Sequence, residues 1–253
     1  MRRGDVAVLS ISAALAAVVV AAVTYSVTIL DRTPNPSALV SDDAAGSLLV
    51  LTWAPSFCTV ERENAACESG EVSRVGQTLV LHGLWPQPRD RQYCGVPEEL
   101  RDRESALPPV QLSDDVRDRL RSTTVDTATL VHHEWYTHGT CAAVSPDTYF
   151  GDAVTLTDEV REVLDPVLRD AAGGRLTLAT VRERIDDTFG AGTGERVGLG
   201  CRTAAGAGAV IVDVRLSLTP AVALRDADGA VSLAESLRQG PPMPAQCRHG
   251  SVP

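Results

Sequence analysis

The sequence contains no lysine, so all 23 of its basic residues are arginine, and 33 acidic residues outnumber them. The net charge is therefore −10, and the isoelectric point is about 4.9. A protein that coats nucleic acid needs a basic surface to neutralise phosphates, so this composition argues against that class. It still permits an enzyme that binds one phosphate in a small local site.

Three motifs of common hydrolases and metal sites are also missing. No Cys-x-x-Cys pair occurs, which argues against a structural zinc site, and no Gly-x-Ser-x-Gly segment supports a serine hydrolase. A zinc protease motif places two histidines four positions apart on one helix face. Here His133 and His138 are five apart, so the spacing argues against a zinc hydrolase and we expect no metal or other cofactor.

The beginning of the chain is apolar. Arg2 and Arg3 precede 25 uncharged residues from Val6 to Leu30. Signal-peptide cores span about 7–15 residues and membrane-spanning helices about 17–25. The length favours an N-terminal apolar helix in residues 1–30 that stays as a signal-anchor, with a cleaved signal peptide as the alternative. Under either interpretation the protein is extracytoplasmic. A cleaved segment would make it secreted, and an uncleaved one would hold it in the membrane.

The rest of the chain has the pattern of a linker followed by one domain. Residues 31–47 are rich in Pro, Ser, Asp and Gly and are interpreted as a linker, and residues 48–253 as a catalytic domain. All six cysteines lie in that domain, an even number that is typical of three disulfides in an exported protein. Fifteen pairings of six cysteines are possible, and composition does not choose among them.

The hydrophobic pattern predicts an α+β fold. Strands are expected at residues 48–53, 78–85 and 209–218, and a long proline-rich loop at 86–110. Helices are expected after Ser113, from Leu130 to Gly139, from Ser145 to about Leu156, from Asp158 to Ala172, and from Thr177 to Phe189. Because strands and helices do not alternate regularly, the central sheet should be largely antiparallel.

Four of the five histidines occupy two short segments. His82 lies in LVLHGLWP (79–86), and the other three lie in HHEWYTHGTC (132–141). A lone histidine in an apolar strand is usually a core residue, but this concentration favours a shared site. On a helix, Glu134 and His138 share a face, and His133 borders the same pocket. A carboxylate beside a histidine favours its protonated form, and two imidazoles can act as an acid and a base.

Both segments resemble the two signature segments of the ribonuclease T2 family, which includes the plant S-ribonucleases. The first fits apolar-x-His-Gly-Leu-Trp-Pro, and the second fits His-Glu-Trp-x-Lys-His-Gly-Thr-Cys at every position but one. Similar stretches occur at residues 48–58, 145–150 and 212–218, so the resemblance covers the whole predicted domain. It implies a ribonuclease T2-like fold with helices packed on the sheet.

The resemblance also implies a metal-independent endoribonuclease. His138 would take the proton of the ribose 2′-OH, and His82 would donate one to the leaving 5′-oxygen. His133 would bind the phosphate, and Glu134 would support the five-coordinate phosphorus. The products would be a 2′,3′-cyclic phosphate and then a 3′-phosphate, so DNA, which lacks the 2′-OH, would not be cleaved.

Further expectations follow from the same resemblance. Trp85, with Tyr93 as a second candidate, would stack on bases of single-stranded RNA. His132 would be peripheral. Apart from the resemblance, we expect the protein to be a monomer. The disulfides implied by the resemblance are Cys58–Cys67, Cys94–Cys141 and Cys201–Cys247.

One departure from the family pattern bears on activity. Thr137 stands where the family has a lysine directly before the catalytic histidine. The competing hypothesis is therefore a domain that keeps the fold but has lost or weakened its activity, and serves in RNA binding or another interaction. Both acid–base histidines and Glu134 are present, which favours the enzyme.

Overall fold

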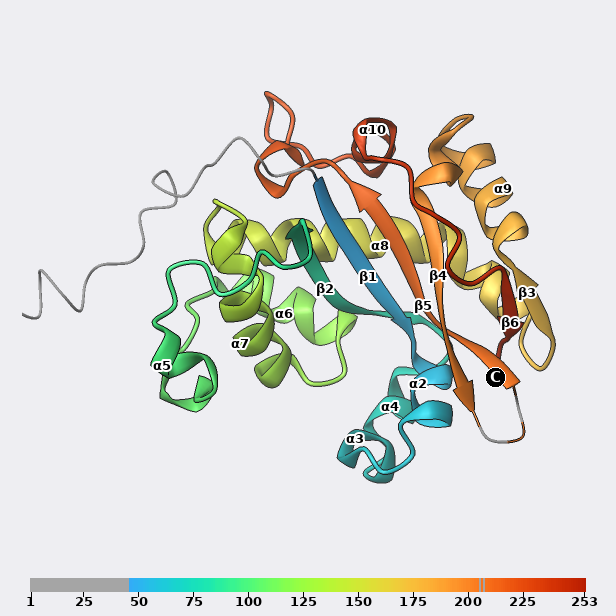
Figure 1. The fold of residues 1–253 in the computed structure, drawn as a ribbon, viewed down its shortest axis with the longest axis horizontal. Coiled ribbons are helices and arrows are strands. Elements are labelled where there is room, and N and C mark those ends of the chain that lie inside the picture. The colour runs from blue at the N-terminus through green and yellow to red at the C-terminus, as the bar shows by residue number, and fades with distance from the viewer. Residues whose placement is uncertain (1–45, 205, 207) are drawn as a thin grey trace, which may run out of the picture. The chain divides into compact units, whose positions relative to one another are not determined.

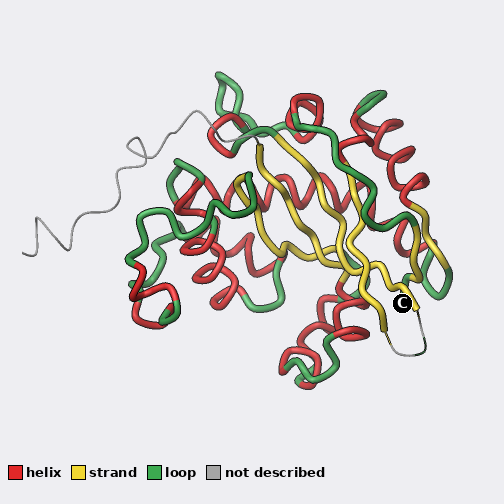
Figure 2. The backbone as a smooth tube through the Cα atoms, viewed as in Figure 1, coloured by secondary structure: helices red, strands yellow, loops and turns green. Residues whose placement is uncertain are grey.

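The computed structural model describes residues 46–253 except 205 and 207, and in them one twisted sheet is surrounded by helices (Figures 1 and 2). The apolar segment predicted at residues 1–30, and nearly all of the linker, lie outside the described residues. Within the described part of the chain, no helix combines the length and the apolar character that crossing a membrane requires.

The sheet has six strands in the order β2-β1-β5-β6-β3, with β4 also paired to β5. Every pairing is antiparallel except the short one between β5 and β6. The predicted α+β class with a largely antiparallel sheet is confirmed. The strands are β1 (Gly46–Trp53), β2 (Leu79–Gln87), β3 (Arg175–Thr177), β4 (Val197–Ala204), β5 (Gly208–Leu218) and β6 (His249–Ser251).

Short helices connect the strands, and longer ones cover the sheet. Side-chain caps on Ser113, Asp126, Ser145, Thr177 and Ser232 satisfy the first free N–H groups of five of them. The helices are α2 (Ala54–Val60), α3 (Ala65–Glu68), α4 (Glu71–Val75), α5 (Glu98–Arg101), α6 (Asp114–Thr123), α7 (Thr127–Thr137), α8 (Pro146–Asp170), α9 (Leu178–Phe189) and α10 (Leu233–Gln239).

Three of the helix predictions need correction. The helices expected at 145–156 and 158–172 are one continuous helix, α8. No glycine or proline interrupts the chain near Thr157, whose hydroxyl donates to the Ala153 carbonyl at 2.7 Å, and apolar residues continue along one face. The helix expected at 130–139 starts earlier, after its Asp126 cap, and ends at Thr137.

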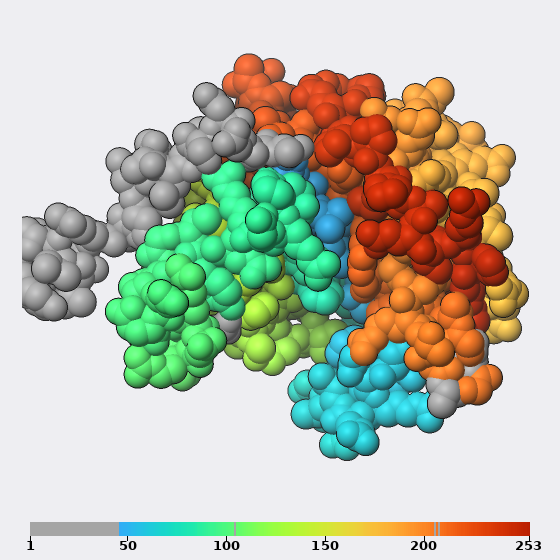
Figure 3. Space-filling view, in the orientation of Figure 1, coloured from blue at the N-terminus to red at the C-terminus, as the bar shows by residue number. Residues whose placement is uncertain are grey.

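Helix α8 runs behind the strands in Figure 1 and covers one face of the sheet. Leu49 and Leu51 of β1 and Leu216 of β5 belong to the core cluster that includes the apolar side chains of α8. Because side chains alternate along a strand, Thr52 of β1 and Asp213 of β5 lie on the opposite face. In the space-filling view, blue atoms of β1 reach the surface between the segment that follows β2 and the C-terminal segment (Figure 3).

Three disulfides join segments of the described part of the chain. They connect Cys58 to Cys67, Cys94 to Cys141 and Cys201 to Cys247, which is the pairing that the family resemblance implies. The second of these ties the loop after β2 to the turn that follows α7. It therefore holds together the two segments that carry the histidines.

Candidate active site

A β-bulge presents His82 on the surface of β2. Val50 of β1 pairs with Gly83 and Leu51 pairs with Leu81, so His82 is the extra residue between them. A bulge re-aims the side chain of the extra residue. His82 is accordingly exposed, although Leu81 and Gly83 on either side of it are buried.

The end of α7 supplies the other residues of the site. His133 and Glu134 lie in its last turns, and His138 leaves the helical path with φ −121° while its N–H donates to the Glu134 carbonyl at 3.0 Å. Gly139 follows because a Cβ there would lie 2.3 Å from the Trp135 ring. His138 is 8% exposed and Glu134 is 3% exposed, whereas His133 lies at the surface.

Trp85 lies close to a histidine of each segment. Its ring centroid is 5.5 Å from that of His82 and 5.2 Å from that of His138, and the His133 and His138 rings are 6.5 Å apart. The Trp85 indole Nε1–H donates to Glu134 Oε2 at 2.9 Å. The structure thus brings together the four predicted catalytic residues around Trp85.

Gly83 makes this arrangement possible. A Cβ at that position would lie 2.1 Å from Glu134 Oε2 and 2.4 Å from Trp85 Nε1, which is closer than such atoms can approach. The glycine that follows His82 is therefore needed for the close approach of α7 to β2. The family motif that the first segment resembles includes this glycine, but the structure is needed to show why a glycine is required there.

The imidazoles of His138 and His82 have lowered pKa values. Burial, followed by the charges of His133 and His82, lowers the pKa of His138 to about 4. Desolvation by its neighbours also lowers the pKa of His82; Asp213 opposes this shift, and His133 and Arg215 add to it. Burial and the two neighbouring imidazoles thus disfavour the protonated form of His138.

Three polar residues next to His82 were not identified from the sequence. Thr52 Oγ1 lies 3.2 Å from His82 Nδ1 and donates to Asp213 Oδ1 at 3.0 Å, and Asp213 Oδ2 pairs with Arg215 Nη2 at 3.1 Å. Their signal was the presence of polar residues inside the otherwise apolar runs LLVLTW and AVIVDVRLSL. Register across strands far apart in sequence was needed to place them beside His82.

The remaining predicted residues lie at the edges of this cluster. Tyr93 has φ 53° and donates its N–H to the Thr137 carbonyl at 2.9 Å, and the Arg101 guanidinium lies 5.9 Å from its ring centroid. Thr137 is 4% exposed, and its hydroxyl has no hydrogen-bond partner among the described residues. His132 lies against Tyr136, with its Nε2 3.4 Å from the Leu107 carbonyl, in agreement with its predicted peripheral place.

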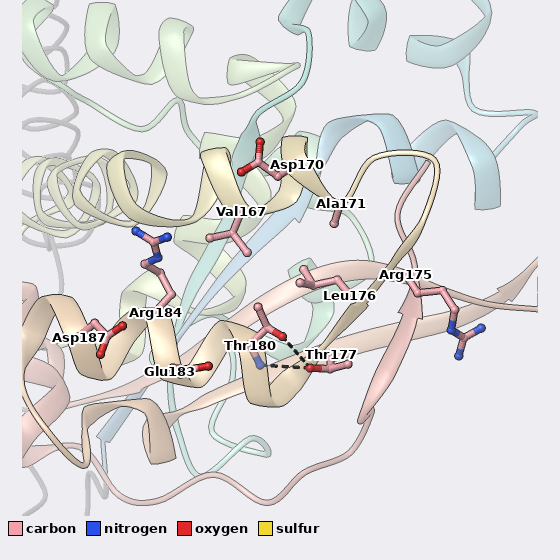
Figure 4. Close-up of a pocket in the computed structure, with 10 residues that line it drawn as sticks. All are labelled: Val167, Asp170, Ala171, Arg175, Leu176, Thr177, Thr180, Glu183, Arg184 and Asp187. Carbon is pink, nitrogen blue, oxygen red and sulfur yellow. Dashed lines mark hydrogen bonds between the residues drawn. The ribbon is translucent and has the colours of Figure 1, made fainter.

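Two cavities of the described domain lie outside this cluster. One of about 340 Å³ is lined by His132 and residues of α6, α7 and the preceding loop. The other, of about 420 Å³, lies between the end of α8, β3 and α9 (Figure 4). None of the predicted catalytic residues lines either one. Within the part of the chain that the structure describes, no group of three His, Cys, Asp or Glu side chains could hold a metal ion.

Sequence comparisons assign a family to the chain. The model of the Ribonuclease T2 family matches residues 46–226. Intracellular ribonuclease LX of Solanum lycopersicum is 29% identical over 161 residues, covering 60% of this chain and 65% of that protein. Ribonuclease I of Escherichia coli is 27% identical over 143 residues, covering 46% of this chain and 53% of that protein. The chain thus spans just under two thirds of the first relative and about half of the second.

Solved structures share the fold. Ribonuclease NT, solved in complex with 5′-AMP, has a TM-score of 0.56 at 20% identity, covering 83% of this chain and 98% of that chain. A mutant of ribonuclease MC1 has a TM-score of 0.51 at 22% identity, covering 67% of this chain and 86% of that chain. These likenesses concern the fold, and the family model covers most of the described residues. The chain belongs to the ribonuclease T2 family.

Proposed function

We propose that this protein is an endoribonuclease that cleaves single-stranded RNA by attack of the ribose 2′-OH on the adjacent phosphorus. The observation that carries the proposal is that His82 of β2 lies close to Trp85 together with His133 and Glu134 of α7 and with His138, which directly follows α7. The nucleophile belongs to the substrate, so the protein needs only to move protons and stabilise charge.

His138 is the base in this mechanism. With a pKa lowered to about 4, its imidazole is neutral above that pH and can accept the 2′-OH proton. The 2′-oxygen then bonds to phosphorus and the bond to the 5′-oxygen breaks, with His82 supplying the proton that the leaving oxygen takes. Water opens the 2′,3′-cyclic phosphate in a second step, with the two histidines in exchanged roles, and leaves a 3′-phosphate.

His133 and Glu134 act on the phosphate. His133 lies at the surface, and its ring centroid is 6.5 Å from that of His138. This position suits an imidazole that contacts a phosphate oxygen. The buried Glu134 carboxylate, held by the Trp85 indole, supports the five-coordinate phosphorus. Trp85, with Tyr93 as the second candidate, stacks on a base, because aromatic rings bind unpaired bases through their faces.

Export of the protein is part of the same proposal. Three disulfides within the domain suit an oxidising compartment outside the cytoplasm. Residues 1–30 would direct the export, either as an anchor or as a cleaved signal. The protein would act as a monomer, since the proposed catalytic residues all come from one chain.

Incubation of the purified protein with single-stranded RNA tests the proposed activity. We expect cleavage that persists in EDTA, and no cleavage of a single-stranded DNA of the same base sequence, because the reaction needs the 2′-OH and no metal. A His82→Ala, His138→Ala double variant prepared in parallel controls for contaminating nuclease. Cleavage that disappears in EDTA and returns with zinc or magnesium would contradict the proposal, and RNA binding without cleavage would favour the inactive domain.

The pH dependence of kcat/KM should have its maximum in mildly acidic solution. His138 must be neutral, and its pKa of about 4 sets the acidic limb. His82 must be protonated, and its pKa, lowered from 6.5, sets the alkaline limb below neutrality. A dinucleotide substrate at constant ionic strength measures both limbs without the repulsion between RNA and an acidic protein.

Long RNA should show an additional effect of salt. An isoelectric point of about 4.9 makes the protein repel RNA at neutral pH, and salt screens this repulsion over a Debye length of about 10 Å at 0.1 M. Salt should therefore partly restore activity at neutral pH on long RNA and have little effect on the dinucleotide. An optimum above about pH 8 at low salt would contradict the assigned protonation states.

A further inference from the structure

A chain of hydrogen bonds leads from His82 into the sheet. His82 Nδ1 lies 3.2 Å from Thr52 Oγ1, which donates to Asp213 Oδ1 at 3.0 Å, and Asp213 Oδ2 accepts from Arg215 Nη2 at 3.1 Å. The four residues come from the neighbouring strands β2, β1 and β5. Thr52 and Asp213 stand directly opposite each other in the register of β1 and β5.

The local backbone structure is adapted to this chain of hydrogen bonds at both of its ends. The bulge in β2 places His82 within reach of Thr52, as described above. On the other side, Gly200 of β4 pairs with Asp213. A Cβ at Gly200 would lie 2.8 Å from Asp213 Oδ2 and 3.0 Å from Arg215 Nη2, so a side chain there would displace this ion pair from its present position.

The chemistry of the partners fixes the direction of the hydrogen bonds. An ionised carboxylate only accepts, and a hydroxyl has a single hydrogen to donate. Because the Thr52 hydroxyl gives its hydrogen to Asp213, it can only accept from His82, and Nδ1 of His82 must carry a proton. The other ring nitrogen, Nε2, is then the atom that gains and loses the proton.

We propose that Thr52, Asp213 and Arg215 are positioning residues that hold His82 with Nδ1 protonated, so that Nε2 delivers the proton to the leaving oxygen; this inference rests on the proposed ribonuclease activity. Asp213 and Arg215 oppose each other in their effect on the charge of His82. Thr52 is buried and Asp213 is partly buried, with 14% of its side chain exposed, so their place in the sheet keeps the orientation of His82 fixed when substrate is absent.

The charges that face His82 come from β5 and from the end of α7. Asp213 of β5 raises the pKa of His82, whereas Arg215 of β5 and His133 of α7 lower it. His138, at the end of α7, is also electrostatically linked to His82. Gln246 accepts from Arg215 Nη1 at 3.0 Å and holds the guanidinium in place. Removal of Asp213 should therefore lower the pKa of His82, and removal of Arg215 should raise it.

Nitrogen NMR of the imidazoles in the full chain tests the tautomer directly and needs no activity. We expect neutral His82 to carry its proton on Nδ1 in the native protein and in Thr52→Ser, which keeps the hydroxyl. Thr52→Val, similar in shape but without a hydroxyl, should give a mixture of tautomers or the Nε2–H form. Thermal unfolding of each variant verifies that it is folded.

Kinetics of the same variants test the catalytic consequence. Thr52→Val should lower kcat by between about 10-fold and 10⁴-fold, the range found for partners that orient a functional histidine, with little change in KM. Asp213→Asn should move the alkaline limb of kcat/KM to lower pH, and Arg215→Gln should move it to higher pH, each by about one unit. Arg238→Gln, which breaks an exposed ion pair with Glu235 on α10, is the matched control and should move neither limb.

The outcomes separate this inference from the proposed function. If RNA is cleaved but the tautomer and the alkaline limb are the same in all variants, the positioning role is wrong. Shifts of Asp213→Asn and Arg215→Gln in the same direction would also overturn it. If the tautomer changes as expected but the native protein cleaves no RNA, the hydrogen-bond chain is supported and the proposed ribonuclease activity fails.

Discussion

Replacement of His82 or His138 by alanine is expected to lower kcat/KM on RNA by about 10²–10⁴-fold, because each contributes one proton transfer in the transition state. The centroids of the two rings lie 5.5 and 5.2 Å from that of Trp85, and the two residues come from different segments. Neither can therefore take the place of the other without a rearrangement of the β2 bulge or of the end of α7.

A second substrate distinguishes the acid from the base. In a uridine 3′-nitrophenyl phosphate the leaving nitrophenolate is stable as an anion and needs no proton. His82→Ala should regain most of its activity on this substrate, whereas His138→Ala should remain impaired, since the 2′-OH proton must still be removed. Recovery of His138→Ala instead would reverse the assignment of the two roles.

His132→Ala is the matched control for both variants. This histidine lies on α7, one residue before His133, but its ring packs against Tyr136 outside the cluster. Its replacement should leave kcat/KM within about twofold of the native value, as expected for a group that takes no part in proton transfer. Near-native rates in His82→Ala or His138→Ala would remove the assignment of catalytic roles.

Introduction of a lysine at Thr137 should raise kcat/KM by about tenfold or more. A charged group at this position can offset charge that grows on the phosphorane, and one such donor is worth about 10²–10³-fold in rate. Thr137 cannot supply this, because it is uncharged and only 4% exposed, with no hydrogen-bond partner for its hydroxyl among the described residues. The native enzyme would therefore be attenuated.

The comparison of Thr137→Lys with Thr137→Met separates charge from side-chain length. Only the lysine should raise kcat/KM on a short single-stranded RNA, and unfolding temperatures verify that both variants are folded. An arginine could already supply the charge: Arg91 is half-buried in the loop whose Tyr93 N–H binds the Thr137 carbonyl, whereas Arg89 is exposed. No gain from the lysine, together with a collapse in Arg91→Gln but not in Arg89→Gln, would favour that explanation. If none of these variants matters, the charge argument is wrong.

Local pattern was enough to predict the elements that carry the histidines. Apolar runs bounded by turns predicted β1, β2 and β5, and the caps at Ser113, Ser145 and Thr177 marked three helix starts. Strand β4 was missed because its sequence, VGLGCRTA, contains two glycines and has the strand conformation through its pairing with β5. Strands β3 and β6, with three residues each, depend equally on distant partners.

The place of Thr52 and Asp213 beside His82 could not be predicted from the sequence, for a related reason. Thr52 and Asp213 are 161 residues apart, and only the register of β1 with β5 makes them neighbours. The bulge that exposes His82 likewise arises from pairing with β1 and cannot be derived from LVLHGLWP alone. The lowered pKa of His138 reflects burial and two neighbouring imidazoles from different elements, which again only the fold brings together.

The order in which products appear tests the central claim most directly. Phosphorus NMR can follow the cleavage of an RNA dinucleotide by the native protein, with the same dinucleotide carrying a 2′-deoxyribose at the cleavage site as the control. The two-histidine mechanism predicts a 2′,3′-cyclic phosphate that accumulates first and then converts to a 3′-phosphate, with no reaction of the deoxy control. A 5′-phosphate product formed without a cyclic intermediate, or cleavage of the deoxy control, would contradict it.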